Sequence, residues 1–340
     1  MKKRRPTGPG ESRFEAAFWL RNAHAQTMWG KFARRVPKIA TVDECMPLPD
    51  GDVIDLHHSS VGEAGTRLLL LHGLEGSARS HYVGGMMHQA SSRGWGATLM
   101  LFRGCGSSPN TARRFYHSGE TTDLAHVFAT LTDRWPNEKW FLAGVSLGGN
   151  VLLKWLGELG TDADQRIRGA AVISVPFDLE AGARKISRGF ARIYDRSFLR
   201  SLRAKAANKL ERYPDLLDRD RLERARTVIE FDDAVTAPVH GFLDAVDYYR
   251  KSSSISYLPK VRVPTLMLSA FDDPFLPREV ISRVRQVADS NPALRFETSD
   301  RGGHVGFVGN RRFFQPFYYA EWRAFEFFDE MERVPEAGYD

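Results

Sequence analysis

Short apolar runs recur along the chain, and helix-like stretches separate them. The apolar runs have strand length and are typical of strands buried on both faces of a parallel sheet. They occur in "TRLLLLHGLEGS", "WGATLMLFRGCG", "WFLAG", "GAAVISVP", "VPTLMLSAF" and "LRFETSD". The stretches between them predict helices, as in "HYVGGMMHQASSRG", "TTDLAHVFATLTDRW" and "PREVISRVRQVADS". This alternation predicts an α/β fold, a mostly parallel sheet with helices on both faces.

Other patterns flank this alternation. The stretch "FEAAFWLRNAHAQTMWGKF" predicts an N-terminal helix, and "PFYYAEWRAFEFFDEM" predicts an aromatic-rich C-terminal helix. Two strands are predicted in "ATVDECMPLPDGDVIDLHHS", joined by a turn at Pro49-Asp50-Gly51, because Asp-Gly between alternating residues favours a hairpin. The threonines and the aspartate of "TTDL" are expected to cap the helix that they begin.

A long helical stretch interrupts the alternation from about Phe177 to Pro259. Because it follows one strand and precedes the next, we interpret it as an inserted cap. The predicted organisation is a tail and helical segment over residues 1–40, a core over 41–176 and 260–340, and a helical cap over 177–259.

Composition places the chain among soluble globular proteins, with 42% hydrophobic and 26% charged residues in 340. The apolar runs are much shorter than the roughly 20 residues that span a bilayer. The basic start "MKKRRPTGPGESRF" has Pro, Gly and Glu where a signal peptide needs an apolar stretch. Two cysteines, Cys45 and Cys105, make no disulfide framework. We therefore expect a cytoplasmic protein. No zinc-ligand spacing is present, and no metal or other cofactor is expected.

The net charge of +6 is concentrated in one region, because residues 184–226 hold 14 Lys/Arg against 6 Asp/Glu. A local excess argues against a nucleic-acid partner. Four arginines spaced by four predict one helix face, and three aromatic residues predict a nearly opposite face. These are Arg188, Arg192, Arg196 and Arg200, and Phe190, Tyr194 and Phe198. We favour a solvated helix with its apolar face on the core. The alternative is a helix that contacts an anionic membrane surface or substrate.

The segment Gly144-Val145-Ser146-Leu147-Gly148 lies between an apolar strand and a helix. It could be a simple small-residue turn. The G-x-S-x-G pattern is also that of a nucleophile elbow, which holds a serine hydroxyl above a sheet. A serine nucleophile needs a base to take its proton and a carboxylate to orient that base.

Candidates for both partners follow Ser146 at strand ends, where open α/β sheets place their sites. Asp272 and Asp273 end one strand, and His304 lies in a loop beyond the last strand. Each alone could be an ordinary turn or loop residue. Together they give the order serine, acid, histidine of α/β-hydrolases. We prefer Asp273, which stands four residues before Pro277, an offset familiar from this fold, and keep Asp272 as the alternative acid.

An acyl-transfer site also needs N–H donors for an oxyanion. The loop "LHGLEGS" follows a buried strand, where one such donor is expected. We assign the main-chain N–H groups of Leu74 and Leu147 to this oxyanion hole. A tight turn at His72-Gly73 is needed with or without that role.

Seven stretches extend the comparison beyond these residues. They are "NAHAQT", "HGLEGS", "FRGCGSSPN", "FYHSGETTDL", "GVSLGGNVLLKWLGE", "DAVDYYRKSS" and "SAFDDPFLP". Through them nearly the whole chain resembles the YheT-like family of α/β-hydrolases, relatives of the ABHD1/2/3-type lipid esterases of eukaryotes. The resemblance implies serine ester hydrolysis with Ser146, an aspartate and His304, and leaves the substrate open. The eukaryotic relatives have an N-terminal membrane anchor, a segment that we do not expect here.

The leading hypothesis is therefore a carboxylic-ester hydrolase that acts on a small-molecule or lipid ester. An acyltransferase, a thioesterase or a lipase-type enzyme could use the same triad. A ligand-binding pseudo-hydrolase is disfavoured, because such proteins typically lose a triad member. His24 and His117 are interpreted as structural histidines and Cys105 as a packed thiol. The pattern predicts no particular oligomeric state.

Overall fold

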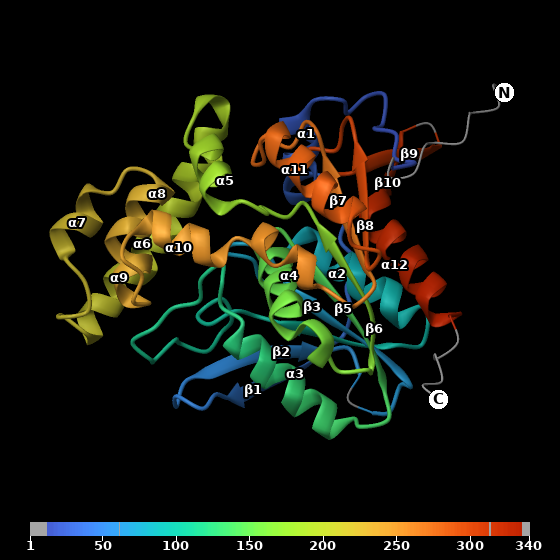
Figure 1. The fold of residues 1–340 in the computed structure, drawn as a ribbon, viewed down its shortest axis with the longest axis horizontal. Coiled ribbons are helices and arrows are strands. Elements are labelled where there is room, and N and C mark those ends of the chain that lie inside the picture. Colours follow the sequence, from blue (N-terminus) through green and yellow to red (C-terminus); the bar gives the residue numbers. More distant parts are fainter. Residues whose placement is uncertain (1–11, 61, 313, 335–340) are drawn as a thin grey trace.

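The computed structural model describes residues 12–60, 62–312 and 314–334, and its centre is an eight-stranded sheet (Figure 1). The spatial order of the strands is β1-β2-β4-β3-β5-β6-β7-β8. Their bounds are β1 Val42–Pro47, β2 Val53–His58, β3 Thr66–Leu71, β4 Gly96–Met100, β5 Lys139–Val145, β6 Ile167–Ile173, β7 Thr265–Ala270 and β8 Leu294–Ser299. Strands β3 to β8 pair in parallel, whereas β1 and β2 pair antiparallel with each other and β2 pairs antiparallel with β4.

Helices cover both faces of this sheet because its central strands are apolar on both faces. In β3, Leu68 and Leu70 belong to one hydrophobic cluster, and Leu69 and Leu71 belong to the other. This alternation follows from the two-residue period of a strand. The first cluster is shared with α2 (His81–Ser91) and α12 (Tyr319–Glu332), and the second with α3 (Thr122–Arg134), α4 (Leu147–Leu159) and α11 (Arg278–Asp289). The prediction of a mostly parallel sheet with helices on both faces is confirmed.

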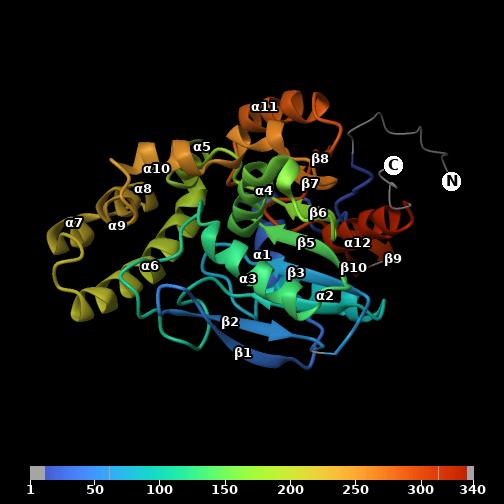
Figure 2. The same ribbon diagram turned by 60° about the horizontal axis from the view of Figure 1, so that its bottom comes forward.

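The stretch predicted to be an inserted cap, residues 177–259 and called the cap segment below, lies between β6 and β7 in the chain. Its helices extend away from one end of the sheet (Figures 1 and 2). Part of the segment has a small hydrophobic cluster of its own, which includes Leu199, Leu210 and Phe231. The α-helices are α5 Leu179–Ile186, α6 Arg192–Arg212, α7 Arg219–Arg224, α8 Val228–Phe231, α9 Ala237–Val239 and α10 Ala245–Ser252. Short 3₁₀ or π turns are η1 Gly160–Asp162, before β6, and η2 Gly189–Ala191, η3 Asp232–Thr236, η4 Ser254–Ser256 and η5 Leu258–Lys260.

Three details differ from the sequence predictions. The N-terminal helix α1 spans only Ala23–Phe32, because the Asn22 side chain accepts hydrogen bonds from the N–H groups of the first turn and so caps it there. The first turn of α3 is capped by the Glu120 carboxylate, which accepts from the Thr122 and Asp123 N–H groups, and the Thr121 side chain makes no cap bond. A second antiparallel pair, β9 (Val308–Arg312) and β10 (Gln315–Tyr318), precedes α12 and was not predicted.

Candidate active site

Ser146 occupies the sharp turn between β5 and α4. Its φ of +54° lies in the left-handed region that residues with a side chain rarely adopt. Small neighbours permit this turn: a Cβ atom on Gly144 would lie 2.7 Å from the main chain of Gly148, and one on Gly148 would clash with the carbonyl oxygen of His72. The glycines of G-x-S-x-G are therefore required by close backbone approach. The turn leaves Ser146 at the carboxyl end of β5.

The structure brings Ser146, His304 and Asp273 into one hydrogen-bonded chain. The Ser146 Oγ and His304 Nε2 atoms are 2.9 Å apart, and His304 Nδ1 is 2.9 Å from Asp273 Oδ2. The Phe275 N–H donates to the other carboxylate oxygen of Asp273 at 2.7 Å, which fixes the carboxylate plane. Asp273 is 1% exposed and His304 is 8% exposed.

Asp272 lies beside this chain and contacts the histidine loop instead of the imidazole. Its Oδ1 atom accepts a hydrogen bond from the Gly303 N–H at 2.9 Å. Burial is the largest influence on this carboxyl group and raises the pKa of Asp272. Of the two aspartates, only Asp273 is within hydrogen-bond distance of His304 in the described residues.

The loop that carries His304 packs against α1, a contact that the sequence did not predict. The His304 N–H donates to Thr27 Oγ1 at 2.9 Å. The Gln26 side chain is fully buried, accepts from the Val308 N–H and donates to the Val308 carbonyl. A Cβ atom on Gly303 would clash with the carbonyl oxygen of Ala23. The "NAHAQT" stretch, singled out only by resemblance, is therefore the segment against which this loop packs.

The N–H groups of Leu74 and Leu147 have no acceptor within the described part of the chain. Leu147 is the first residue of α4, where main-chain N–H groups are free. The loop of Leu74 is held by His72, whose Nε2 accepts from the Phe102 N–H at 3.0 Å while Nδ1 contacts the Gly73 carbonyl. Burial lowers the pKa of His72 to about 4, so the ring is neutral at pH 7. These contacts leave both amides available at the serine turn.

Glu75 is a site residue that sequence reasoning missed. It has a φ of +54°, and its carboxylate accepts from the Tyr116 hydroxyl at 2.7 Å, from Lys205 Nζ at 2.8 Å and from the Ser201 hydroxyl. Ser201 and Lys205 belong to α6, so Glu75 joins the loop of Leu74 to the cap segment. A charged residue next to Leu74 in "HGLEGS" was the available signal, but its partners on α6 are more than a hundred residues away.

A cavity of about 450 Å³ lies between the cap segment and the core, and Leu74 and Leu147 form part of its wall. Volumes of this size suit small organic ligands. Apolar side chains of both parts line it, among them Phe115, Tyr116, Leu202, Phe231 and Val235. The cavity wall therefore includes Leu147 of the serine turn and several residues of α6.

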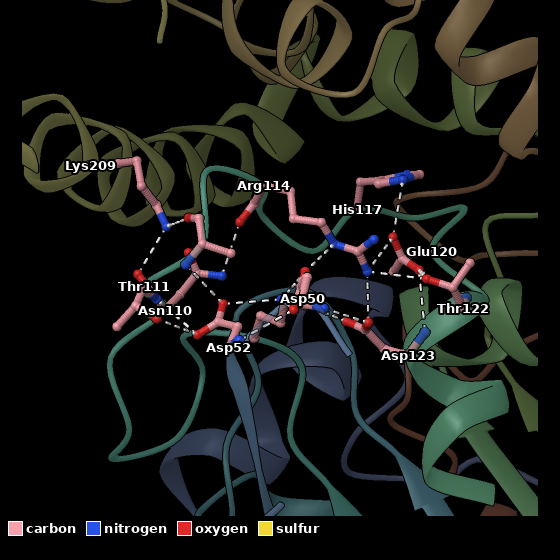
Figure 3. Close-up of polar contacts among 12 residues, drawn as sticks. Asp50, Asp52, Asn110, Thr111, Arg114, His117, Glu120, Thr122, Asp123 and Lys209 are labelled. Atoms are coloured by element: carbon pink, nitrogen blue, oxygen red, sulfur yellow. Dashed lines mark hydrogen bonds and ion pairs between the residues drawn. The ribbon is translucent and has the colours of Figure 1, made fainter. Parts of the chain in front are cut away.

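A buried ionic network holds the loop over residues 102–121, which forms another part of the cavity wall. Arg103 is 3% exposed and pairs with Asp50, Asp52 and Asp123 at 2.6 to 3.1 Å. In Figure 3, Asp50, Asp52 and Asp123 lie near one another, and Arg114 lies above Asp50 and Asp123. The "FRGCG" and "FYHSGETTDL" stretches are thereby tied to the hairpin of β1 and β2.

The histidines and the cysteine interpreted as structural lie around this site. His24 Nδ1 is 3.2 Å from the Tyr194 hydroxyl of α6, and burial lowers the pKa of His24. His117 packs on His240 and accepts from the Gly119 N–H, and burial holds its pKa well below the ordinary value. Cys105 has a basic partner that was not foreseen, Lys205 Nζ at 3.4 Å. Burial nevertheless raises the pKa of Cys105 to about 11, so the thiol stays protonated at pH 7.

The predicted arginine row is only partly on one helix. Arg188 precedes the short turn η2 with extended backbone, so it is not in the row, and Phe190 lies in that turn and not in α6. Arg192, Arg196 and Arg200 do belong to α6 and are exposed. On the aromatic side, Tyr194 and Phe198 contact Phe275, whose ring stacks on His304 at 4.0 Å. Contact of the arginines with a membrane surface stays a prediction.

Two properties of the described residues bear on ligands and membranes. No group of three His, Cys, Asp or Glu side chains in residues 12–60, 62–312 and 314–334 is placed to hold a metal ion. Over the same residues, no helix has the length and the hydropathy that crossing a membrane requires.

Known proteins share this architecture. A family model described as "alpha/beta hydrolase fold" matches residues 66–310. The chain is 39% identical over 293 residues to "Putative esterase YheT" of Escherichia coli (strain K12), with 85% of each protein covered. It is 33% identical over 259 residues to "Monoacylglycerol lipase" of Saccharomyces cerevisiae (strain ATCC 204508 / S288c), covering 73% of this chain and 56% of that protein. An esterase of Pyrococcus furiosus has a TM-score of 0.56 at 16% identity, over 88% of this chain and 98% of that one.

A mostly parallel sheet with this family match over residues 66–310 defines an α/β-hydrolase. The chain belongs to that family, in its YheT-like branch. Because its relatives are named esterase and lipase, the chain is assigned to the hydrolases.

Proposed function

We propose that this hydrolase cleaves carboxylic esters through Ser146, His304 and Asp273. The observation that carries the proposal is the unbroken hydrogen-bonded chain from Ser146 Oγ through His304 to Asp273, with both links at 2.9 Å. At the Ser146 end of this chain are the main-chain N–H groups of Leu74 and Leu147, which lack acceptors in the described residues. A nucleophile, a base, an orienting carboxylate and oxyanion donors are the parts that acyl transfer needs.

The geometry supports a two-step mechanism. His304 Nε2 takes the proton of Ser146 as Oγ attacks the acyl carbon, while Asp273 stabilises the imidazolium. The Leu74 and Leu147 N–H groups bind the oxyanion of the tetrahedral intermediate. His304 then gives its proton to the leaving alcohol, which produces the acyl-enzyme. Water, deprotonated by His304, attacks that acyl-enzyme, and the acid is released as Ser146 regains its proton.

Small-molecule or lipid esters are the proposed substrates. A cavity of about 450 Å³ with several apolar side chains begins at the proposed oxyanion amides, which suits an acyl or alkyl group. The name of the yeast relative, monoacylglycerol lipase, agrees with an ester that has an apolar arm.

A fluorophosphonate probe tests the nucleophile directly. It should label the unmodified protein, and Ser146→Ala should abolish both the labelling and the hydrolysis of p-nitrophenyl butyrate. The matched control is Ser107→Ala, since Ser107 is an exposed serine that lines the same cavity. Labelling that persists in Ser146→Ala would rule out Ser146 as the nucleophile.

A further inference from the structure

One face of α6 brings positive charge into the cavity beside the serine turn. Lys205, Asn208, Lys209 and Arg212 all line this cavity. Their spacing of three and four residues places them on the same helix face. Arg196 and Arg200 of the same helix line a different, outward-facing groove. The helix therefore has two separate basic faces, and the inner one was not predicted from the sequence.

Most of the charge on the inner face lacks a carboxylate partner. Lys205 pairs with Glu75 at 2.8 Å. Lys209 and Arg212 have no carboxylate within ion-pair distance among the residues that the structure describes. Lys209 is only 6% exposed, and its Nζ donates to the carbonyl groups of Asn110 and Ala112. Neutral carbonyl groups satisfy its hydrogen bonds but leave its charge uncompensated.

The surroundings of Lys209 do not supply the missing negative charge. Asp52 is the carboxylate that favours the charged form, but it already pairs with Arg103 and binds the Thr111 N–H. Burial is the main influence, and Arg212 and Arg103 add repulsion, so the pKa of Lys209 falls to about 8. Lys209 is therefore still largely protonated at pH 7. A buried charge without a counter-charge is costly, and a bound anion would offset that cost.

Another carboxyl group on the cavity wall, Asp232, forms no ion pair with Lys209 or Arg212 among the residues that the structure describes. Its two oxygens accept from the Thr236 hydroxyl at 2.6 Å and the Tyr249 hydroxyl at 2.6 Å. Phe231 and Val235 line the cavity beside it. The cavity thus combines an apolar wall with a cationic one, and it begins at Leu74 and Leu147.

We propose that this cavity binds esters that carry an anionic group, with Lys209 and Arg212 as the anion subsite. The inference rests on the proposed ester hydrolysis, because it assigns the substrate class of that same site. The apolar arm of the substrate packs on Tyr116 and Phe231. A carboxylate or a phosphate shares the chemistry that the two cations recognise.

Competition with three ligands of equal chain length tests the proposal. Hexyl phosphate, hexanoate and 1-hexanol are measured as inhibitors of p-nitrophenyl butyrate hydrolysis at low ionic strength. We expect the inhibition constant of at least one anion to be about tenfold or more below that of 1-hexanol, because only the anions gain a charged partner. The inhibition constants of hexyl phosphate and hexanoate together show whether the subsite prefers a phosphate or a carboxylate group.

The variants Lys209→Met and Arg212→Gln should raise the inhibition constants of the anions about tenfold relative to that of 1-hexanol. Arg196→Gln, on the outer face of α6, is the matched control and should leave this ratio unchanged. If Lys209 only ties the loop at Asn110 and Ala112, its replacement lowers Tm and shifts all three constants together. That result, or equal inhibition by anions and 1-hexanol in the unmodified protein, overturns the proposal.

Different results would overturn the proposed ester hydrolysis and the proposed anion subsite. If p-nitrophenyl butyrate is not hydrolysed, the proposed ester hydrolysis is at fault, and binding of the same three ligands to the unmodified protein is then measured by calorimetry. Tighter binding of an anion that depends on Lys209 supports the subsite. Equal binding of all three ligands contradicts it.

Discussion

The main-chain N–H of His304 donates to the side-chain hydroxyl of Thr27 at 2.9 Å, although 277 residues separate the two in sequence. Through this bond α1 holds the loop of the proposed catalytic base. In the same loop Val305 and Phe307 have left-handed φ values that residues with a side chain rarely adopt, so its local conformation is strained and depends on outside contacts.

We predict that Thr27→Val lowers kcat on p-nitrophenyl butyrate about 10- to 100-fold, because a small displacement of a catalytic group has effects of that size. Thr27→Ser keeps the accepting oxygen and should retain most of the activity. Steady-state kinetics alongside Tm values separate the two variants. Unchanged kcat in a folded Thr27→Val protein would show that the bond does not position His304.

The two adjacent aspartates are expected to respond differently to amidation. Asp273→Asn should lower kcat by roughly 10³- to 10⁴-fold, because the amide no longer stabilises the imidazolium form of His304. Asp272→Asn retains an oxygen that can accept from the Gly303 N–H, so a loss below about tenfold is expected. Measuring kcat of both variants on one ester shows which aspartate orients His304. A larger loss in Asp272→Asn than in Asp273→Asn would assign the acid role to Asp272.

Glu75 is predicted to position the Leu74 amide. Glu75→Ala removes the contacts to Tyr116, Ser201 and Lys205, and we expect kcat to fall about tenfold with little change in KM. Loss of a whole oxyanion donor typically costs 10²- to 10³-fold, so partial displacement should cost less. Glu75→Gln, which keeps one accepting oxygen, should recover part of the loss. A rise in KM alone would assign Glu75 to substrate binding instead.

The buried Asp232 predicts a pH dependence of stability. Burial is the main influence and raises the pKa of Asp232 to about 6, so the folded state holds this proton more tightly than the unfolded state does. Its contribution to stability is therefore full below about pH 4 and is lost as the pH rises to about 6, by at most about 1.4 kcal/mol per pH unit.

Urea unfolding of the unmodified protein and of Asp232→Asn from pH 4 to pH 7 measures this dependence. The difference in unfolding free energy between the two should change with pH up to about 6 and then level off. Thr236→Val removes a hydrogen bond to Asp232 without removing the titrating group, and serves as the control. A difference that is constant over this range would show that Asp232 does not titrate as predicted.

Much of the core was predictable because its signals are local. The continuous apolar run of β3 predicts a strand buried on both faces, and Asp50-Gly51 predicts the hairpin turn, where Gly51 has a φ of +81°. The glycines around Ser146 predicted the strained serine turn. Asp273 and His304 followed from the order of strand ends, and the structure brings both of them to Ser146.

What could not be predicted depends on contacts between distant segments. Helix α1 begins where the Asn22 side chain caps it. Its role in holding the His304 loop depends on a contact between Thr27 and His304, which are far apart in sequence. Glu75 and Lys209 are ordinary charged residues in the sequence, and their importance follows from how α6 lies over the cavity. The row from Arg188 to Arg200 has the spacing of one helix, but the chain is extended at Arg188. Periodicity alone does not detect such an interruption.

The cap segment leaves the sheet after β6 and returns before β7, and these two strands are hydrogen-bonded neighbours, with Ala170 opposite Thr265. Because β6 and β7 are parallel, the segment leaves at the carboxyl end of β6 and returns at the amino end of β7. Near its two ends the Ile255 N–H donates to the Phe177 carbonyl at 3.0 Å, so the stretch between these residues can change in length without altering the strand ladder. Ser146, Asp273 and His304 all lie outside it. The segment between Phe177 and Ile255 can therefore differ in size while the three proposed catalytic residues keep their positions, as long as Ser201 and Lys205 still hold Glu75.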